Sequence, residues 1–479
     1  MQSRRDQVQA HVFVMSRLAS GMLRAEPDAP DTPHGRTTRG ALIGLALGLA
    51  VCAGVGVYGL VEPGGSTSWE KPGALVVVNE TGARFLYLGG ALHPVFNGTS
   101  ARLLAGTQMT IQDVSQASLN GVARGEPVGI VGAPDGLPPA TSLSRGTWLA
   151  CGVTEASSSG GTMPQLDVGI GLETQGAQLT ATQGALVSTP DGTTYLLWDG
   201  QRLKVDTADD ALQALGFEQD RPTPVTGSFL NALPAGPDLA APAIAGPGTA
   251  GPTLAGAPSK VGQLFSGPNG DHYVLTESGL MPLTATQLDL LRGDPDIQQK
   301  AYGGSMVTMA QIGPEDLAAN TAPGVASVVL PASPPTLVTP GQGQGVCADV
   351  HPAGASPVTS VSIVEAAAVA GLVPAPQPGV VPSCTEADQI AVRPGGGALV
   401  RALSGGGNGT TDYLVTDQGV KYPIPSATVV GSLGYASVTP TAVPDGLLDF
   451  LPTGPSLDPS LLTDGGVVDP SAPEAPCAD

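Results

Sequence analysis

One arrangement of apolar and polar positions occurs four times along the chain. Each copy has an apolar run, a turn that contains glycine, a second short run that often ends in proline, and a leucine-rich stretch that closes on glycine. The clearest copy is YLVTDQGVKYPIPSATVVGSLGY, residues 413–435, and the others begin at Phe85, Tyr195 and Tyr273. Alternating apolar positions around a glycine turn indicate two paired strands, and the leucine-rich stretch indicates a short helix. We therefore expect a strand, a turn, a second strand and a helix in each copy.

Four glycines mark the turns of these copies: Gly90, Gly200, Gly279 and Gly419. They stand 110, 79 and 140 positions apart, whereas solenoids and propellers keep one short period. The uneven spacing instead indicates four small modules around a shared centre. We expect each glycine to adopt a positive φ or to let two backbones approach closely, because glycine has no side chain to oppose either.

Two stretches between the copies, residues 107–190 and 300–400, alternate short Val, Ile and Leu runs with Gly and Pro turns. They lack helical periodicity and are predicted to be the strands of a central β domain. The predicted fold class is a single-pass membrane protein with a β-rich (α+β) ectodomain. Its predicted parts are a cytoplasmic helix and hinge (1–39), a transmembrane helix (40–61), repeat 1 (70–106), the first part of the central domain (107–190), repeat 2 (193–233), a Pro/Gly linker (234–258), repeat 3 (260–299), the second part of the central domain (300–400), repeat 4 (408–457) and a disordered tail (458–479).

Residues 7–25, QVQAHVFVMSRLASGMLRA, are predicted to form an amphipathic helix. The apolar residues that recur at helical spacing are Val8, Val12, Met15, Ala19 and Met22. One interpretation is a plain surface helix. The other is a basic amphipathic helix that lies on the inner face of a membrane or docks onto a cytoplasmic partner.

An uncharged run, GALIGLALGLAVCAGVGVYGLV, extends from Gly40 to Val61. As a helix, these 22 residues span about 33 Å, which is enough to cross the core of a bilayer. Because Arg36 and Arg39 precede the run and Glu62 follows it, the positive-inside rule places the N-terminus in the cytoplasm and the rest of the chain outside. A cleaved signal peptide is the alternative. The long polar lead and the lack of a small-residue cleavage pattern favour an uncleaved anchor.

Three glycines, Gly40, Gly44 and Gly48, recur every four residues within this run and therefore lie on one face of the expected helix. Small residues at such spacing let membrane helices approach closely, which predicts a transmembrane packing face. The alternative is that glycine is simply frequent in membrane helices.

Composition and charge narrow the classes of function. Gly accounts for 67 and Pro for 46 of the 479 residues, and aromatic residues for 4%, which suits a β-rich chain with many turns. The net charge of −21 argues against a nucleic-acid partner, because a phosphate binder needs a basic face. The excess of negative charge lies beyond residue 40, since residues 1–40 contain six Arg and only four Asp or Glu residues.

The five cysteines fall into two groups. Cys52 lies inside the apolar run and is expected to be an inert apolar residue. Cys151, Cys347, Cys384 and Cys477 fall in the part expected outside the membrane, where disulfides form. Four cysteines allow three pairings, and their spacing does not choose among them.

No catalytic constellation stands out in the sequence. A phosphate-binding loop needs a Gly-Lys pair, and the chain has none. The serines in GGSTS (64–68) and GGSMV (303–307) lack the last glycine of a nucleophile elbow. His93 and His272 fall inside the repeated copies and are expected to be half-buried strand residues. We therefore expect no enzyme, no cofactor and no metal site.

With these parts named, the chain resembles the EccB family, a core membrane component of the type VII (ESX) secretion system of actinobacteria. The matching phrases are QVQAHVF in the first helix, ALHPVFNGTSARLLAG in the first copy, FLNALPAGPDL before the linker, GVKYPIPSATVVGSLGY in the fourth copy and LLDFLPTGPSLDPS after it. The resemblance implies four repeat domains around a central β-rich domain. It also implies a place in the cell (inner) membrane, with the C-terminal domain extracytoplasmic.

The resemblance carries further expectations about partners and cysteines. The implied partners are the channel protein EccD, the FtsK-like ATPase EccC, EccE, the mycosin protease and further copies of the chain itself. The family's central disulfide maps onto Cys151 and Cys347. Cys347 with Cys384 is the alternative, and the pairing of Cys384 and Cys477 stays open. Some members are credited with ATPase activity, to which no residue of this chain is assigned.

The favoured function is therefore a structural core subunit that organises the extracytoplasmic side of a type VII secretion channel. One alternative is a peptidoglycan-binding anchor, because the fold of the family's repeats resembles a cell-wall-binding subunit of phage lysins, although a fold alone does not fix a function. The other alternative is a weak ATPase.

Overall fold

The computed structural model describes most of the chain, namely residues 3–24, 33–61, 67–156, 161–173, 176–322, 329–352, 357–404, 409, 411–462 and 466–469. The chain forms two compact units. One contains residues 1–70, 78–82 and 113–122, and the other contains residues 71–77, 83–112 and 123–479.

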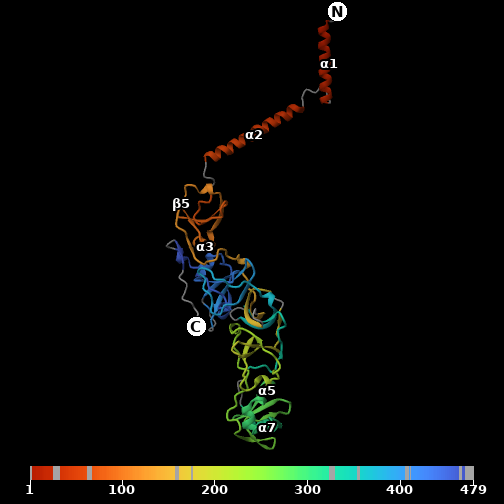
Figure 1. The fold of residues 1–479 in the computed structure, drawn as a ribbon, viewed down its shortest axis with the longest axis vertical. Coiled ribbons are helices and arrows are strands. Elements are labelled where there is room, and N and C mark those ends of the chain that lie inside the picture. The colour runs from red at the N-terminus through yellow and green to blue at the C-terminus, as the bar shows by residue number, and fades with distance from the viewer. Residues whose placement is uncertain are drawn as a thin grey trace. The chain divides into compact units, whose positions relative to one another are not determined.

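Two helices dominate the first unit, α1 (Arg4–Arg24) and α2 (Pro33–Val61), drawn as red ribbons in Figure 1. The helix predicted for residues 7–25 is thus confirmed, and the apolar run lies within α2. This unit also holds the turn after β1 (Ala74–Val78), where the Asn79 amide donates to the Val114 carbonyl at 2.9 Å. A 3₁₀ turn, η2 (Gln116–Leu119), follows.

The four repeated stretches each form a β-hairpin followed by a helix, which is the predicted local order. Their elements are β2 (Arg84–Leu88), β3 (Ala91–Pro94) and α3 (Gly98–Ala105); β11 (Thr194–Trp198), β12 (Gln201–Lys204) and α4 (Ala211–Ala214); β17 (His272–Thr276), β18 (Gly279–Leu283) and α5 (Ala285–Gly293); and β25 (Asp412–Thr416), β26 (Lys421–Ile424) and α8 (Ala427–Ser432). Whether these stretches are separate modules stays a prediction.

Polar caps explain where three of these helices begin. Asn97 accepts a hydrogen bond from the Ser100 amide at the start of α3, and Ser426 accepts one from the Val429 amide at the start of α8. Thr284 and Gln287 form a reciprocal capping box at the start of α5. Such side chains satisfy amides that have no partner within the helix, so the helix starts where the cap stands.

Three small sheets share one topology. In each, the strand that precedes the hairpin pairs antiparallel with the hairpin's first strand. On its other edge, this preceding strand pairs in parallel with a strand that comes after the hairpin. We number these sheets by the repeated copy that supplies the hairpin. The second small sheet has the order β12-β11-β10-β13, the third β18-β17-β16-β19 and the fourth β26-β25-β24-β27. The added strands are β10 (Gln183–Ser188), β13 (Thr223–Pro224), β16 (Leu264–Ser266), β19 (Met309–Gln311), β24 (Gly397–Leu403) and β27 (Thr441–Pro444).

A six-stranded sheet joins two distant parts of the chain, in the order β23-β8-β7-β21-β22-β9. Strands from both predicted central stretches therefore share one sheet, because β7 pairs with β21 as well as with β8. The strands are β7 (Trp148–Ala156), β8 (Thr162–Ile170), β9 (Ala177–Gln178), β21 (Gln344–His351), β22 (Val358–Glu365) and β23 (Gln389–Val392). We call it the central sheet.

One face of the central sheet carries the largest hydrophobic core. Side chains at alternate positions, such as Trp148 on β7, Val168 on β8 and Val350 on β21, are at most 2% exposed. They pack with Val187 from the second small sheet and Val415 from the fourth. The second and fourth small sheets thus cover the same face of the central sheet.

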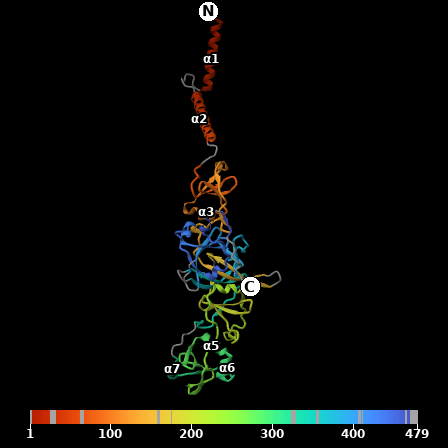
Figure 2. The same ribbon diagram turned by 90° about the vertical axis from the view of Figure 1, so that its left-hand side faces the viewer.

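The remaining helices and strands complete the second unit. Figure 2 shows α5, α6 and α7 gathered around the third small sheet, drawn in green. These remaining elements are β4 (Thr110–Val114), β5 (Ala123–Arg124), β6 (Gly129–Ile130), β14 (Ala250–Leu254), β15 (Ala257–Lys260), α6 (Pro295–Tyr302), α7 (Pro314–Asn320), β20 (Thr336–Leu337), α9 (Asp445–Leu448) and β28 (Val467–Val468). Short 3₁₀ turns lie at Gly106–Gln108, Ala140–Ser142, Ser228–Ala232, Ala366–Ala368 and Pro459–Leu462.

The predicted linker at residues 234–258 is wrong in part. Its second half forms the β14–β15 hairpin, and Leu239 and Leu254 are buried. The Pro/Gly composition concealed these elements, because two apolar side chains suffice to fix the stretch onto cores supplied by its neighbours. The tail predicted from residue 458 is wrong in part as well, since β28 pairs with β6. Residues 463–465 and 470–479 lie outside the described residues.

The predicted borders of the central domain also need correction. β10 lies within the first predicted central stretch and β24 begins within the second, but they belong to the second and fourth small sheets. β19 lies beyond residue 300 yet pairs with β16 in the third small sheet. Apolar runs that are buried on both faces look alike in the sequence, so the pattern does not say which sheet a run joins.

Candidate functional site

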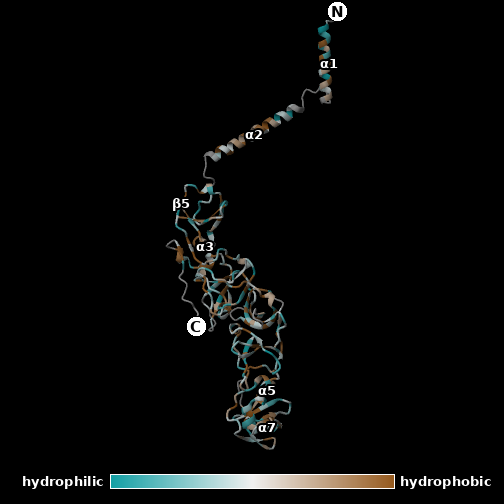
Figure 3. Cartoon of the chain, in the orientation of Figure 1, coloured by the Kyte–Doolittle hydropathy of each residue, from teal (hydrophilic) through white to brown (hydrophobic). Residues whose placement is uncertain are grey.

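Helix α2 is long and apolar enough to cross a membrane. Within the candidate span Gly35–Gly59, an 18-residue window has a mean hydropathy of 2.2, and the apolar character of the helix is visible as the brown part of α2 in Figure 3. Leu45, Leu49 and Val55 on this helix are each more than 60% exposed. An apolar surface of this extent in a folded chain marks a region that lipid or another protein covers.

The three predicted packing glycines all lie on α2. A Cβ added at Gly40, Gly44 or Gly48 would meet nothing within 4 Å in the described chain. This strip of α2 therefore contacts no other described part of the protein, and its predicted packing role stays a prediction.

Helix α1 presents an apolar strip of its own. Val8, Val12 and Met15 are each more than half exposed, and Met22 is 85% exposed. Both interpretations of α1, a surface helix or a helix docked onto a membrane or a partner, therefore remain open.

The four turn glycines all have the positive φ that was expected. The values are 82° for Gly90, 70° for Gly200, 126° for Gly279 and 73° for Gly419. The turns Gly89–Gly90 and Asp199–Gly200 are two-residue hairpin loops in which both residues have positive φ. That geometry matches the twist of the flanking strands and favours glycine.

Three of these glycines also allow a close approach. A Cβ on Gly200 would overlap the carbonyl oxygen of Thr359 on β22, and one on Gly279 would overlap that of Asn320. A Cβ on Gly419 would lie 2.8 Å from Cγ2 of Ile390 on β23. The turns of the second and fourth hairpins thus pack directly against the central sheet, which gives these two glycines a structural role.

Alanine at Gly200 is expected to destabilise the protein by about 3 kcal/mol, because it adds both backbone strain at positive φ and a collision with a backbone oxygen. Gly90 is a matched control, because it shares the positive φ but has open space around it. Gly90→Ala should cost about 1 kcal/mol. Urea unfolding midpoints of the two variants measure the difference, and equal losses would refute the close-approach explanation.

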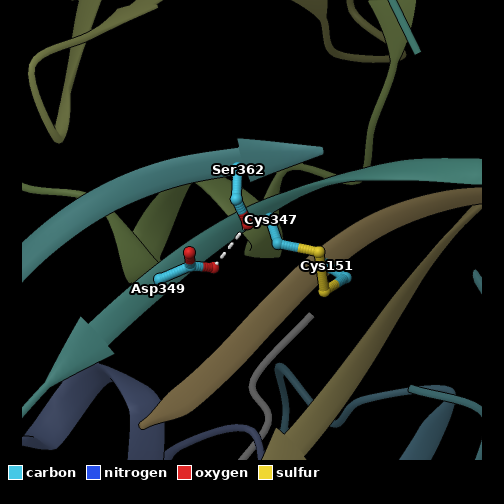
Figure 4. Close-up of a disulfide and its surroundings, with 4 residues drawn as sticks. All are labelled: Cys151, Cys347, Asp349 and Ser362. Atoms are coloured by element: carbon cyan, nitrogen blue, oxygen red, sulfur yellow. Dashed lines mark hydrogen bonds between the residues drawn. A yellow bond between two sulfur atoms is a disulfide. The ribbon is translucent and has the colours of Figure 1, made fainter. Parts of the chain in front are cut away.

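Cys151 and Cys347 form a disulfide at the middle of the central sheet, with an S–S distance of 2.07 Å (Figure 4). This is the pair that the family resemblance implies. The two residues stand directly opposite each other on β7 and β21, and both side chains are fully buried. Cys347 is therefore not paired with Cys384, which was the alternative. Cys52 is free and exposed on α2, and Cys477 lies outside the described residues.

A row of polar residues crosses the sheet at the level of the disulfide. Cys151 is paired in register with Asp167 on β8, and Cys347 with Ser362 on β22. Directly opposed residues in antiparallel strands point to the same face, so the disulfide and both polar side chains share one face. We call it the disulfide face.

Asp167 is a buried carboxylate with one oxygen that accepts no hydrogen bond from the described residues. Its side chain is 2% exposed, and Oδ1 has no hydrogen-bond partner among the described residues. Burial, together with the nearby charges of Asp388 and Glu155, raises the pKa of Asp167 to about 7. The carboxyl group is therefore close to half protonated at neutral pH.

Asp349 is a second buried carboxylate on this face. Burial raises its pKa to about 6, while a hydrogen bond from Ser362 and the charge of His351 oppose that rise. The Ser362 hydroxyl donates to Oδ1 of Asp349 at 2.8 Å, as Figure 4 shows. Sequence reasoning missed both acids, because the search for chemistry considered only motifs and histidines. The available signal was their place within the apolar runs LDVGI and VCADV.

Asp167→Asn is expected to remove part of the pH dependence of stability. Because the pKa of Asp167 is higher in the folded than in the unfolded chain, the folded state holds an extra proton between about pH 4 and pH 7. Stability therefore falls as pH rises through that window, by roughly 4 kcal/mol, and then levels off. Unfolding midpoints from pH 4.5 to 8 should show a flatter curve for Asp167→Asn. The exposed Asp271→Asn should follow the wild-type curve, and identical curves for all three proteins would contradict the assignment.

A polar hollow of about 530 Å³ lies at one end of the disulfide face. Thr147, Asp349, His351 and Arg393 are among its lining residues, and Nδ1 of His351 lies 2.8 Å from the Thr147 hydroxyl. Within the described ranges, no group of three His, Cys, Asp or Glu side chains is arranged to bind a metal ion. The hollow therefore offers polar contacts but no metal centre.

His93, His272 and His351 lie on three different sheets. His93 is on β3, where its Nδ1 lies 3.0 Å from the Glu126 carbonyl, His272 is on β17 and His351 is on β21. In the part of the chain that the structure describes, these histidines do not converge on one site.

Comparison with known proteins agrees with these features. Residues 1–462 match the family model described as type VII secretion system ESX-1, transport TM domain B. The chain is 28% identical to the ESX-3 secretion system ATPase EccB3 of Mycolicibacterium smegmatis, over 95% of this chain and 89% of that protein. It is 27% identical to the ESX-1 secretion system ATPase EccB1 of Mycobacterium tuberculosis, over 98% of this chain and 97% of that protein.

Two solved structures have a similar fold. One is the EccB3 dimer from the ESX-3 core complex, with a TM-score of 0.63 and 26% identity over 81% of this chain and 98% of that one. The other belongs to an intact ESX-5 inner membrane complex, with a TM-score of 0.64 and 22% identity over 100% of this chain and 98% of that one. At such identity the second likeness concerns the fold alone.

Proposed function

Because the chain belongs to the EccB family of type VII secretion proteins, we propose that it is a structural core subunit of a type VII secretion complex. Its role is to organise the extracytoplasmic side of the membrane channel. The observation that supports this role most strongly is the combination of one membrane-length helix with a large β-rich unit, both within the match to the family model. The role also suits a disulfide-closed central sheet, which keeps a fixed shape.

The proposed topology places α1 in the cytoplasm, α2 across the membrane and the β-rich unit outside. Arg36 and Arg39 precede the apolar part of α2, as the positive-inside rule requires. A disulfide between Cys151 and Cys347 also suits an oxidising compartment.

Protease added to intact protoplasts is expected to remove the chain beyond about residue 62 and to leave an N-terminal fragment that contains α1. Disrupted protoplasts are the control, in which the N-terminal fragment should be digested as well. A β-rich unit that survives on intact protoplasts would contradict this topology.

The proposed partners are EccC, EccD, EccE, the mycosin protease and further copies of the chain. The support is that similar solved structures are described as a dimer and as part of an inner membrane complex. Blue-native gel analysis of detergent-extracted membranes should show the chain in one large assembly, from which mass spectrometry identifies these proteins. Migration of the chain as a lone monomer under mild extraction would refute the proposal.

A non-enzymatic role is proposed although relatives carry the word ATPase in their names. The sequence has no phosphate-binding loop, because it contains no Gly-Lys pair. Purified protein in detergent should hydrolyse ATP no faster than the buffer with detergent alone. Hydrolysis that co-elutes with the protein through two chromatography steps would establish the enzymatic alternative. Sedimentation with purified cell wall would similarly establish the peptidoglycan-binding alternative.

A further inference from the structure

The polar hollow at one end of the disulfide face contains a buried acid and two exposed basic side chains. Asp349 is 9% exposed, whereas His351 and Arg393, which also line the hollow, are exposed. The hollow has a volume of about 530 Å³, which falls within the range of about 300–1,000 Å³ typical of small-molecule sites. Its size and its partly exposed lining suit a small molecule that enters from the solvent.

The Asp349 carboxylate has a hydrogen-bond partner for one of its two oxygens. The Ser362 hydroxyl donates to Oδ1 at 2.8 Å, and Figure 4 shows the second oxygen directed away from Ser362. Among the described residues, no group donates to Oδ2. Burying a carboxylate without enough donors costs free energy, because the group loses its hydration. A donor that enters the hollow therefore recovers part of this cost.

His351 supplies a donor on the same face. It lies two residues after Asp349 on β21, so both side chains point to the disulfide face from positions about 7 Å apart. The Thr147 hydroxyl lies 2.8 Å from Nδ1 of His351. When that hydroxyl donates to Nδ1, the neutral ring carries its proton on Nε2. Within the described ranges, Nε2 has no hydrogen-bond partner and is available to a ligand.

Arg393 reaches the same end of the sheet from another strand. One row of neighbouring residues crosses β23, β8, β7 and β21, and its members are Val392, Ile170, Trp148 and Val350. β23 and β21 run in the same direction, so Arg393 and His351 both follow this row and both point to the disulfide face. The Arg393 guanidinium has no ion-pair partner in the part of the chain that the structure describes.

This arrangement of one acceptor and two donors matches the two charges of a free α-amino acid. With one hydrogen bond at each end, the ammonium and carboxylate groups of such a molecule span about 8–9 Å between their partner atoms. That span is close to the separation of about 7 Å between Asp349 and His351 along the strand. A cation alone would leave Arg393 without a partner, and an anion alone would lie against the Asp349 carboxylate.

We propose that the hollow binds a free α-amino acid, whose ammonium group donates to Asp349 and whose carboxylate accepts hydrogen bonds from His351 and Arg393. This ligand is additional to the protein partners proposed above. Because it contacts β21 and β23 together, the bound amino acid stabilises the folded central sheet.

Calorimetric titration of the purified full-length chain in detergent tests the class of ligand. Each of the standard L-amino acids is a probe, and at least one is expected to bind at a single site. Its two analogues, one without the amino group and one without the carboxylate, should each bind at least about tenfold more weakly, because each loses one charged contact. A dipeptide that ends in the same residue should also bind more weakly, because its two charges lie farther apart. The proposal is overturned by a lack of binding from every amino acid, or by equal binding of the probe and any of these three compounds.

Substitutions locate the site. Asp349→Asn removes the charge but keeps the shape of the side chain and an oxygen for the Ser362 hydroxyl, and it should weaken binding by about tenfold. Arg393→Gln should weaken binding similarly, and because Arg393 is exposed it decides the question even if Asp349→Asn does not fold. Asp271→Asn and Arg221→Gln change exposed residues outside the hollow and should keep the wild-type affinity. Unchanged affinity in both hollow variants, or an equal loss in the two controls, would overturn the assignment.

Discussion

Replacing both Cys151 and Cys347 with alanine is expected to lower the free energy of unfolding of the β-rich unit by about 4–5 kcal/mol. The two residues are 196 positions apart, and a crosslink across so long a loop removes much of the conformational entropy of the unfolded chain. Both side chains are fully buried, so the substitution also loses contacts inside the sheet. Urea unfolding under oxidising conditions, followed by circular dichroism, measures the change.

Hydrogen exchange locates the loss. Faster exchange is expected first in β7 and β21, because these two strands carry the crosslink. Cys52→Ser is the control, since that cysteine is free and belongs to helix α2 rather than to the sheet. An unfolding midpoint that reductant leaves unchanged in the wild-type protein would show that the disulfide adds nothing to stability.

Leucine at both Gly44 and Gly48 is expected to abolish assembly of the chain with its secretion partners. Residues four apart on a helix turn by about 40° relative to each other, so Gly40, Gly44 and Gly48 form a slowly winding groove. Leucine side chains fill that groove and keep a partner helix at a distance, at a cost of about 1 kcal/mol or more per site. The measurement is recovery of the channel protein with tagged chain from detergent extracts, together with secretion.

Ala46 and Ala50 provide the matched control, because they lie about 200° and 240° around the same helix from Gly44. Ala46→Leu with Ala50→Leu places the same leucine side chains on the opposite face, with one carbon less added at each site, and should leave assembly intact. The disulfide should form in both variants, since it lies outside α2. Equal recovery of partners with wild-type and glycine-substituted chains would mean that these glycines only reflect the composition of membrane helices.

The local elements were predictable because their causes are local. A glycine between two alternating runs fixes each hairpin, and caps such as Asn97, Thr284 and Ser426 fix the starts of three helices. The pairing of β7 with β21 was not predictable from the pattern, because the register of distant strands depends on contacts that no short stretch contains. The same reason explains why β10 and β24 were assigned to the wrong sheet.

The candidate site was predictable where either the sequence pattern or the family resemblance applied. The apolar run of α2 and the four turn glycines follow from the residues themselves, whereas the Cys151–Cys347 pair followed from the resemblance. Asp167 and Asp349 were missed, since burial of a carboxylate depends on which strands flank it. In LDVGI the polar residue occupies an inward position, and only the finished sheet shows that both faces are covered.

The long interval between β8 and β21 imposes an order on the maturation of the protein. Because β7 and β8 precede β21 in the chain, they are synthesised first and form a hairpin whose β7 edge has no neighbour until β21 arrives. Exposed strand edges invite pairing with other chains, and slow long-range pairing prolongs that exposure. The third small sheet, which lies entirely within the interval, completes itself meanwhile. Until β21 pairs with β7, Cys151 stays a thiol. Formation of the Cys151–Cys347 disulfide therefore marks the completion of the central sheet.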